Sequence, residues 1–210
     1  MTMPDTNKTP HEFWEEIYQG KSPLSGGKPS AILEKYIFGR EPGIALDLGC
    51  AKGDDAVWLA SQRWQVTAVD ISPTALGYAK INAERSGVAD KITFKQYDLA
   101  KDFPEIQCDL VTVMFLQTPF DFPRVNVWRR AAACLRPRGL LLIATHSDPV
   151  SDTRGELNKR LPTAHESLDQ LNLAPSNWRE IFVGSIKRKG VGPHGRDVTV
   201  IDTIIAIERR

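Results

Sequence analysis

The sequence has little cysteine, no long apolar run and no excess of charge of one sign. Its three cysteines, Cys50, Cys108 and Cys134, are an odd number at wide spacings without a CxxC pair, a pattern that favours reduced thiols over a disulfide framework. No stretch approaches the roughly 20 apolar residues of a membrane span, and the polar N-terminus lacks the apolar centre of a signal peptide. We therefore expect a cytoplasmic protein without membrane contact.

The net charge and the chain length limit the kinds of substrate and assembly that we expect. The formal charge is +1, with Lys and Arg spread along the chain, so the sequence has no basic footprint for nucleic acid and a small molecule is the expected substrate. A length of 210 residues suits one structural domain, acting as a monomer or homodimer. No cluster of residues with the spacing of metal ligands is visible, and none is predicted to bind a metal.

The most informative stretch begins with a strand and a glycine-containing loop. The apolar run Ile44–Leu48 is followed by Gly49, Ala51 and Gly53, and then by a helical pattern. Without a Cβ atom, the two glycines can take positive φ and allow a ligand to approach the backbone. This pattern is typical of the first loop of a βαβ unit that binds a nucleoside.

A second apolar run, Val66–Val69, ends at Asp70. At this position of a βαβ unit a carboxylate lies beside the first loop, where it can accept hydrogen bonds from both ribose hydroxyls. Ser72 already provides an N-cap for the next helix, so capping is not needed to explain Asp70. The sequence therefore predicts that Asp70 binds a ribose.

Acidic residues near the loop argue against a pyrophosphate ligand. Asp54 and Asp55 occupy the first helical turn, where they suit the helix dipole but repel phosphate. Asp47, inside the first strand, suits a ligand with an ammonium or a sulfonium group. S-adenosylmethionine carries both groups, and we expect it to be the cofactor, with S-adenosylhomocysteine as the product.

Four segments in order resemble the class I S-adenosylmethionine-dependent methyltransferases. DLGCAKG matches the family's [D/E]xGxGxG motif with Ala51 in place of the middle glycine, KITFKQYDL supplies an acidic residue after strand three at Asp98, CDLVTVMFLQ follows as strand four, and LRPRGLLLIATH is similar to the LkPGG turn before strand five. The resemblance covers roughly residues 30 to 150.

This resemblance implies an α/β fold: a Rossmann-like, seven-stranded, mostly parallel sheet with a C-terminal antiparallel hairpin and helices on both faces. Residues 1–38 would form a tail and cofactor-covering helices, and residues 39–210 the methyltransferase domain. The residues implied in cofactor binding are Trp14, Tyr18, Asp47, Gly49, Cys50, Ala51, Gly53, Asp70, Ile71, Asp98 and Leu99.

Local patterns agree with this fold. Residues 11–38 read as two short helices, and Pro73–Ser86 as a helix that Gly87 ends. Alternation over residues 92–95 predicts an edge strand, whereas the apolar run LLLIA predicts a central parallel strand. The segments IFVGSIKRKG and DVTVIDTIIAIE flank a glycine-rich turn and predict the terminal hairpin.

The N-terminal segment FWEEIYQGK places Trp14 and Tyr18 one helical turn apart. It resembles the WxxxWxxGK segment of thiopurine-type methyltransferases, in which the aromatic pair covers the cofactor. The alternative is a hydrophobic patch that packs the helix onto the core.

The acceptor is less clearly marked than the cofactor. Transfer of a methyl group by in-line displacement needs positioning more than a base, so a small soft nucleophile is expected: a thiol, or a selenium or tellurium oxyanion. His146, after strand five, is the candidate base, or else a structural histidine.

Other acceptor signals are weak. The basic run Lys187–Lys189 with Arg196 could attract an anionic substrate or be solvated. QTPF at residues 117–120 lacks the first two residues of the [D/N]PP[Y/F] amine motif, and Ser147–Asn177 carries no decisive motif. Two alternatives stay open at this stage: a non-catalytic S-adenosylmethionine-binding module, and a nicotinamide-dinucleotide dehydrogenase.

Overall fold

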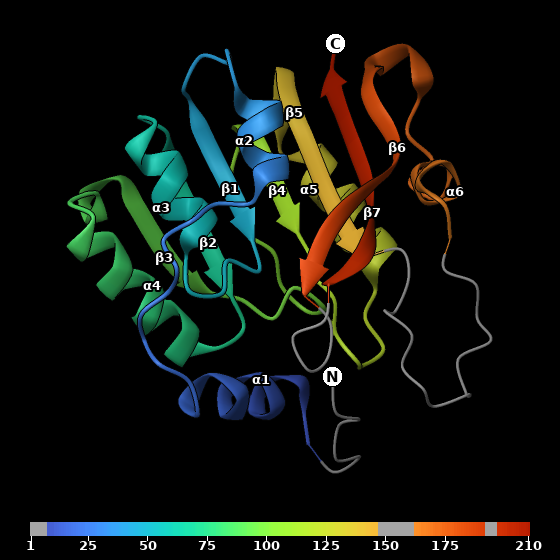
Figure 1. Ribbon diagram of the computed structural model, residues 1–210. Coiled ribbons are helices and arrows are strands. Elements are labelled where there is room, and N and C mark those ends of the chain that lie inside the picture. Colours follow the sequence, from blue (N-terminus) through green and yellow to red (C-terminus); the bar gives the residue numbers. More distant parts are fainter. Residues whose placement is uncertain (1–7, 147–161, 192–196) are drawn as a thin grey trace.

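The structure is a computed structural model that describes residues 8–146, 162–191 and 197–210 (Figure 1). Its strands are β1 (Ile44–Leu48), β2 (Gln65–Asp70), β3 (Ile92–Gln96), β4 (Cys108–Met114), β5 (Leu135–His146), β6 (Trp178–Val191) and β7 (Asp197–Arg209). Its α-helices are α1 (Pro10–Gln19), α2 (Ala31–Ile37), α3 (Asp54–Ser61), α4 (Pro73–Arg85), α5 (Arg124–Ala133) and α6 (Ala164–Asp169), with short 3-10 turns at Ala89–Lys91 and Pro175–Asn177.

The seven strands form one sheet in the order β3-β2-β1-β4-β5-β7-β6. The first five of these are parallel, and β7 runs antiparallel to both β5 and β6. The predicted fold class, with β3 at the edge and a terminal antiparallel pair, is confirmed. The turn that joins the last two strands lies outside the described residues.

Helices cover both faces of the sheet, and each face has its own hydrophobic core. One core contains residues of α2, α3 and α4, and the other contains residues of α5 and α6. Successive strand residues alternate between them: Ala45 lies in the first core and Leu46 in the second. The run Leu140–Ala144 of the central strand β5 is apolar throughout because both faces of this strand are buried.

Helix α4 begins and ends where its sequence signals predict. The Ser72 hydroxyl accepts a hydrogen bond from the Ala75 amide at 3.0 Å, and Pro73 is the first helical residue. The last helical residue is Arg85, and Gly87 takes a φ of +67° just beyond it.

The turn expected before strand five takes a different form. Leu135 already pairs with Cys108, so β5 starts there, and the ladder shifts register before Leu110 pairs with Leu140. The extra residues form a bulge in which Arg138 has a φ of +68°. A Cβ atom on Gly139 would lie 2.8 Å from the Arg136 carbonyl oxygen, so the bulge requires glycine there.

The strand order reverses between β1 and β4, because β2 and β3 lie on one side of β1 and the later strands lie on the other. Helix α1 lies across the carboxyl ends of the parallel strands (Figure 1). In open α/β sheets, ligands bind at such a reversal point. No helix in the described part of the chain is long and apolar enough to cross a bilayer.

Candidate functional site

A cleft opens at the carboxyl ends of β1 and β4 and consists of two joined cavities. The larger has a volume of about 600 Å³ and the smaller about 300 Å³. Both are lined by Tyr18, Gly49, Ala51, Met114 and Phe115. The two cavities therefore form one elongated site, which passes over the loop after β1.

The loop after β1 needs left-handed backbone at three positions. Gly49 has a φ of +77° and Gly53 a φ of +81°, and a Cβ atom would lie 2.7 Å from Leu116 Cδ1 at the first and 2.8 Å from Ala79 Cβ at the second. Ala51, in place of the middle glycine, also has a positive φ, of +50°. The loop thus keeps the glycine-type conformation although it has lost one glycine.

Asp70 ties this loop to the start of α4. One carboxylate oxygen accepts the Ala51 amide at 2.9 Å and the other accepts the Ser72 amide at 3.0 Å. Burial raises the pKa of Asp70, although the amide hydrogen bonds act in the opposite direction. Each carboxylate oxygen can accept a second hydrogen bond, and Asp70 lines the smaller cavity.

Asp47 has a buried carboxylate oxygen without a partner. Its Oδ1 accepts the Thr112 hydroxyl at 2.7 Å, whereas its Oδ2 is buried with no hydrogen-bond donor in the described part of the chain. Burial, together with the smaller effect of the negative charge of Asp55, raises the pKa of Asp47 to about 7. Since a buried unpaired carboxylate is costly, this oxygen is suited to a ligand that carries a hydrogen-bond donor and a positive charge.

Asp54 and Asp55, which were interpreted as phosphate-repelling, also hold the chain that precedes α2. Asp54 accepts the Gly27 amide at 3.0 Å, and Asp55 accepts the Ser30 amide at 2.6 Å. Burial raises the pKa of Asp55 to about 6. These contacts bring Lys28–Ile32 to the wall of the larger cavity, a role that the sequence analysis missed because the contacts are non-local.

The residues after β2 and β3 that the resemblance implies in cofactor binding line the smaller cavity. Ile71, Asp98 and Leu99 lie on its wall together with Trp14. Asp98 forms an ion pair with Lys101 at 2.9 Å and accepts the Ala100 amide at 3.1 Å.

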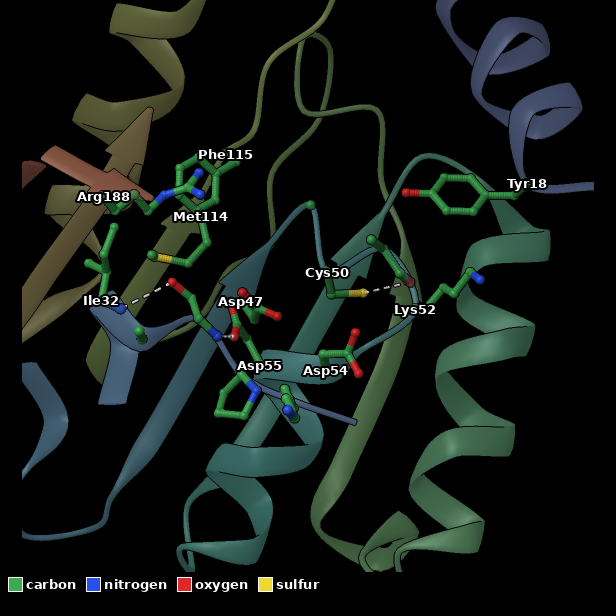
Figure 2. A pocket seen from close by; sticks show the side chains of 16 residues that line it. Tyr18, Ile32, Asp47, Cys50, Lys52, Asp54, Asp55, Met114, Phe115 and Arg188 are labelled. Atoms are coloured by element: carbon green, nitrogen blue, oxygen red, sulfur yellow. Dashed lines mark hydrogen bonds between the residues drawn. The ribbon is translucent and has the colours of Figure 1, made fainter. Parts of the chain in front are cut away.

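Helix α1 contributes both predicted aromatic residues to the cleft. The rings of Trp14 and Tyr18 lie 6.4 Å apart, and Figure 2 shows the Tyr18 hydroxyl directed toward the loop that carries Cys50. Burial raises the pKa of Tyr18 far above its usual value. Phe13, on the same helix, is buried, so α1 both packs on the core and covers the cleft.

Glu15 holds α1 to the start of α4. Its carboxylate accepts the Ser72 hydroxyl at 2.6 Å and both the amide (3.2 Å) and the hydroxyl of Thr74. The contact joins α1 to the turn that follows Asp70.

Cys50 is buried and lines the larger cavity. Burial raises the pKa of its thiol well above the usual value, and the charges of Asp70 and Asp47 add to the effect. The side chain is therefore a neutral thiol, not a nucleophilic thiolate.

His146 belongs to a cluster at the other end of the cleft. Its Nδ1 lies 2.8 Å from Oδ1 of the fully buried Asp202, whose Oδ2 accepts Nε of Arg188 at 2.5 Å. The His146 ring stacks on Phe115 at 4.5 Å between centroids, and Phe115 and Arg188 line the larger cavity. Asp202 was not predicted from the sequence.

Phe115, which the sequence analysis also missed, has a backbone signature of a functional position. It follows β4 directly and has a φ of +57°, which is costly for a bulky residue and concentrates at ligand sites. Its place at the end of the predicted fourth strand was the signal that could have found it.

No group of three or more His, Cys, Asp or Glu residues is placed to hold a metal ion in residues 8–146, 162–191 and 197–210. Of the segment 147–177, in which the sequence analysis looked for an acceptor motif, residues 147–161 lie outside the described residues. Arg196 also lies outside them.

The sheet order, the loop after β1 and the cleft define the Rossmann-like fold of class I methyltransferases. Residues 45–139 match the sequence model of the methyltransferase domain family. The putative methyltransferase YqeM of Bacillus subtilis is 29% identical over 115 residues, which cover 51% of this chain and 44% of YqeM. The chain spans less than half the length of the first curated relatives that it matches.

Solved structures extend the likeness in fold to nearly the whole chain. A structure reported for the conversion of a disulfide bond into a thioacetal group in echinomycin biosynthesis has a TM-score of 0.70 at 24% identity, covering 95% of this chain and 92% of the other. TehB of Haemophilus influenzae has a TM-score of 0.67 at 14% identity, covering 95% and 66%. The N-methyltransferase NodS of Bradyrhizobium japonicum, solved with S-adenosylhomocysteine, has a TM-score of 0.62 at 17% identity, covering 97% and 89%.

Proposed function

We propose that this protein is an S-adenosylmethionine-dependent methyltransferase that acts on a small soft nucleophile. The observation that carries the proposal is the unpaired Oδ2 of Asp47, buried at 3% exposure beside the loop after β1. An anionic oxygen in this position is suited to the cationic amino-acid end of S-adenosylmethionine. A phosphate, which is itself an anion, would be repelled by it.

The remaining residues of the cleft fit the rest of the cofactor. Asp70 would accept the ribose hydroxyls with its remaining lone pairs, and Asp98, Ile71 and Leu99 would surround the adenine. Gly49 would allow close approach of the methionine part, and Trp14 and Tyr18 would cover the site. The bound cofactor supplies a methyl group activated by its sulfonium, and the protein has to exclude water and align the acceptor.

Family likeness supports the same activity. The match to the methyltransferase domain family covers residues 45–139, which include Asp47, Asp70 and Asp98. NodS was solved with S-adenosylhomocysteine. The structure associated with thioacetal formation, at 24% identity, supports the fold alone. The tellurite-type acceptor rests on TehB, whose 14% identity supports the fold alone.

His146 is the proposed base for an acceptor that must lose a proton. Asp202 fixes the ring through Nδ1 at 2.8 Å, which leaves Nε2 to accept a proton. An acceptor that is already an anion needs no base, and His146 would then orient Phe115 through their stacked rings.

The proposal also includes the division of the chain into an N-terminal covering segment at 1–38 and a methyltransferase domain at 39–210. Two observations support this division. Helix α1 lines the cleft, and all strands of the sheet follow residue 38 in the sequence. A cytoplasmic location, with Cys50, Cys108 and Cys134 as reduced thiols, is consistent with all three being unpaired and buried.

Isothermal titration with S-adenosylmethionine, S-adenosylhomocysteine and NADH tests the proposal. We expect micromolar binding of both adenosyl ligands and none of NADH. Asp47→Asn removes the charge at constant shape and should weaken adenosyl binding by at least about tenfold. Asp90→Asn, an exposed carboxylate before β3, is the matched control and should change nothing.

Two other outcomes identify the alternatives. Binding of NADH alone would replace the proposal with a dehydrogenase. Binding of the adenosyl ligands without methylation of any thiol, selenol or tellurite would indicate a non-catalytic binding module.

A further inference from the structure

Arg188 places a fixed cation at one end of the larger cavity. It lies on β6, and its Nε donates to the fully buried Asp202 at 2.5 Å. This contact uses only one of the guanidinium's three nitrogens, and the terminal N–H groups are the paired donors that bind a carboxylate in a bidentate manner. The guanidinium carbon lies 5.8 Å from the centre of the Phe115 ring, which restricts its position further.

The charges that line the larger cavity are separated along its length. Asp47, Asp54 and Asp55 lie on the side of the loop after β1. Figure 2 shows Arg188 away from them, in one group with Met114 and Phe115. Lys52, a second cation of the wall, donates to the carbonyl oxygens of Ser22 (2.5 Å) and Leu24 (3.3 Å). Lys28 also lines the cavity, next to Pro29 and Ser30 in the segment that Asp54 and Asp55 hold, whereas Arg188 is the cation that stands with Met114 and Phe115.

The surroundings of Arg188 define the rest of a binding region. Ile32, Met114 and Phe115 provide an apolar wall beside the guanidinium, and His146 stacks on the Phe115 ring. A cation framed by apolar and aromatic side chains is suited to a flat or aliphatic molecule that ends in an anionic group.

We propose that Arg188 binds a carboxylate of the methyl acceptor, so that the substrate is an anionic small molecule. The inference rests on the proposed function. It adds that the acceptor carries a negative group besides its nucleophile, and that Arg188 selects for that group. Asp202 is the positioning residue, because it holds the guanidinium at the cavity wall.

The cofactor also carries a carboxylate, which is the competing source of the same chemistry. Three strands, β4, β5 and β7, separate β1 from β6, and the Arg188 side chain reaches back over the sheet to the Phe115 ring, which follows β4. The ammonium and carboxylate of an amino acid are bonded to the same carbon atom. Figure 2 shows Arg188 grouped with Met114 and Phe115 and apart from Asp47, so we assign the guanidinium to the acceptor, and the test below distinguishes it from the cofactor's carboxylate.

The test uses the full-length protein saturated with S-adenosylhomocysteine and two probes that differ in one group, 4-mercaptobenzoate and 4-mercaptobenzamide. Calorimetry measures the affinity of each probe. The wild-type protein is expected to bind the carboxylate at least about tenfold more tightly than the amide. Arg188→Gln should abolish this preference, and Arg188→Lys should retain part of it.

Lys187→Gln is the matched control, because it removes one positive charge from the same strand. Neighbouring residues of a strand point to opposite faces, so this variant should keep the wild-type preference. The affinity for S-adenosylhomocysteine should stay within about twofold of wild type in all three variants, which also shows that they are folded.

The contrary results are distinct from one another. The inference is overturned if the wild-type protein does not favour the carboxylate probe, or if Arg188→Gln keeps the preference. Neither result can be explained by unfolding, because an unfolded protein would bind neither probe. A loss of S-adenosylhomocysteine affinity in Arg188→Gln would assign the residue to the cofactor's carboxylate instead. Failure of the wild-type protein to bind S-adenosylhomocysteine would reject the proposed function itself.

Discussion

The two ends of the cleft are built in different ways. The donor end, where we place the cofactor, consists of residues at or just after the parallel strands β1, β2 and β3: Asp47, Gly49, Asp70 and Asp98. The acceptor end consists of Phe115, His146, Arg188 and Asp202, which come from β4 and the C-terminal strands. Backbone amides fix the first end, whereas side chains that meet across strands fix the second.

Because of this difference, a substitution at the donor end affects the backbone of the site, whereas a substitution at the acceptor end affects side chains only. At the donor end, Asp70 accepts two backbone amides, so a change there disturbs the loop as well as the ligand. At the acceptor end, Asp202 joins His146 and Arg188 through side chains alone. We infer that acceptor specificity can change by substitution at this end without loss of cofactor binding.

The largest effect is expected at Asp70. Asp70→Asn should weaken S-adenosylhomocysteine binding about 100-fold, because hydrogen bonds to a charged group contribute about 1.5–3 kcal/mol each and tenfold corresponds to about 1.4 kcal/mol. Titration calorimetry measures the change, with Asp90→Asn as control. Equal affinities for the Asp70 variant and wild type would show that Asp70 does not bind the ribose.

The next effect concerns the loop at the donor end. Gly53→Ala should lower the free energy of unfolding by about 2 kcal/mol, since it adds a methyl group 2.8 Å from Ala79 Cβ and strains a residue at φ +81°. Gly77→Ala, on the helix that carries Ala79, meets no atom within 4 Å and should raise it by about 0.5–1 kcal/mol. Urea denaturation compares the two variants, and equal changes would contradict the close packing of this loop.

A pH dependence should follow from Asp47. Because burial raises its pKa to about 7, cofactor binding by the carboxylate form should be about eightfold stronger at pH 7.5 than at pH 6. The sign for folding is opposite: the raised pKa stabilises the ligand-free protein at low pH, and this contribution is lost between about pH 4 and 7 as the pH rises.

Titrations of S-adenosylhomocysteine at the two pH values, with thermal unfolding of the free protein, measure both trends. Asp47→Asn should reduce both. A wild-type affinity that does not change with pH would show that the ligand does not use this carboxylate.

The smallest effect is expected in the helix that covers the cleft. Glu15→Ala removes the contacts of α1 with Ser72 and Thr74 and should weaken cofactor binding about fivefold, the equivalent of one hydrogen bond of about 1 kcal/mol. Glu16→Ala, the neighbouring position that pairs with Lys8, should leave affinity unchanged. If both variants bind as wild type, α1 does not contribute through this contact.

The donor end could be predicted from the sequence because its signals are local. A strand, a loop with Gly49 and Gly53, and a strand that ends at Asp70 fit within 30 residues, and their spacing alone brings them to one edge of a parallel sheet. The same reasoning predicted the edge position of β3 and the caps of α4. It treated the segment before β5 as a turn, because a bulge depends on the partner strand.

The acceptor end depended on the order of the strands. His146 lies directly opposite Asp202 in the β5–β7 ladder, and Arg188 lies two residues from the partner of Asp202 in the β6–β7 ladder. These three residues are far apart in the sequence and carry no shared motif. Local residue types and spacing thus predicted the individual strands and the cofactor side of the cleft, and the resemblance to class I methyltransferases implied how the strands form one sheet. Only the antiparallel register of the last strands brought a buried carboxylate between a histidine and an arginine, because pairing between distant strands is fixed by packing of the whole sheet.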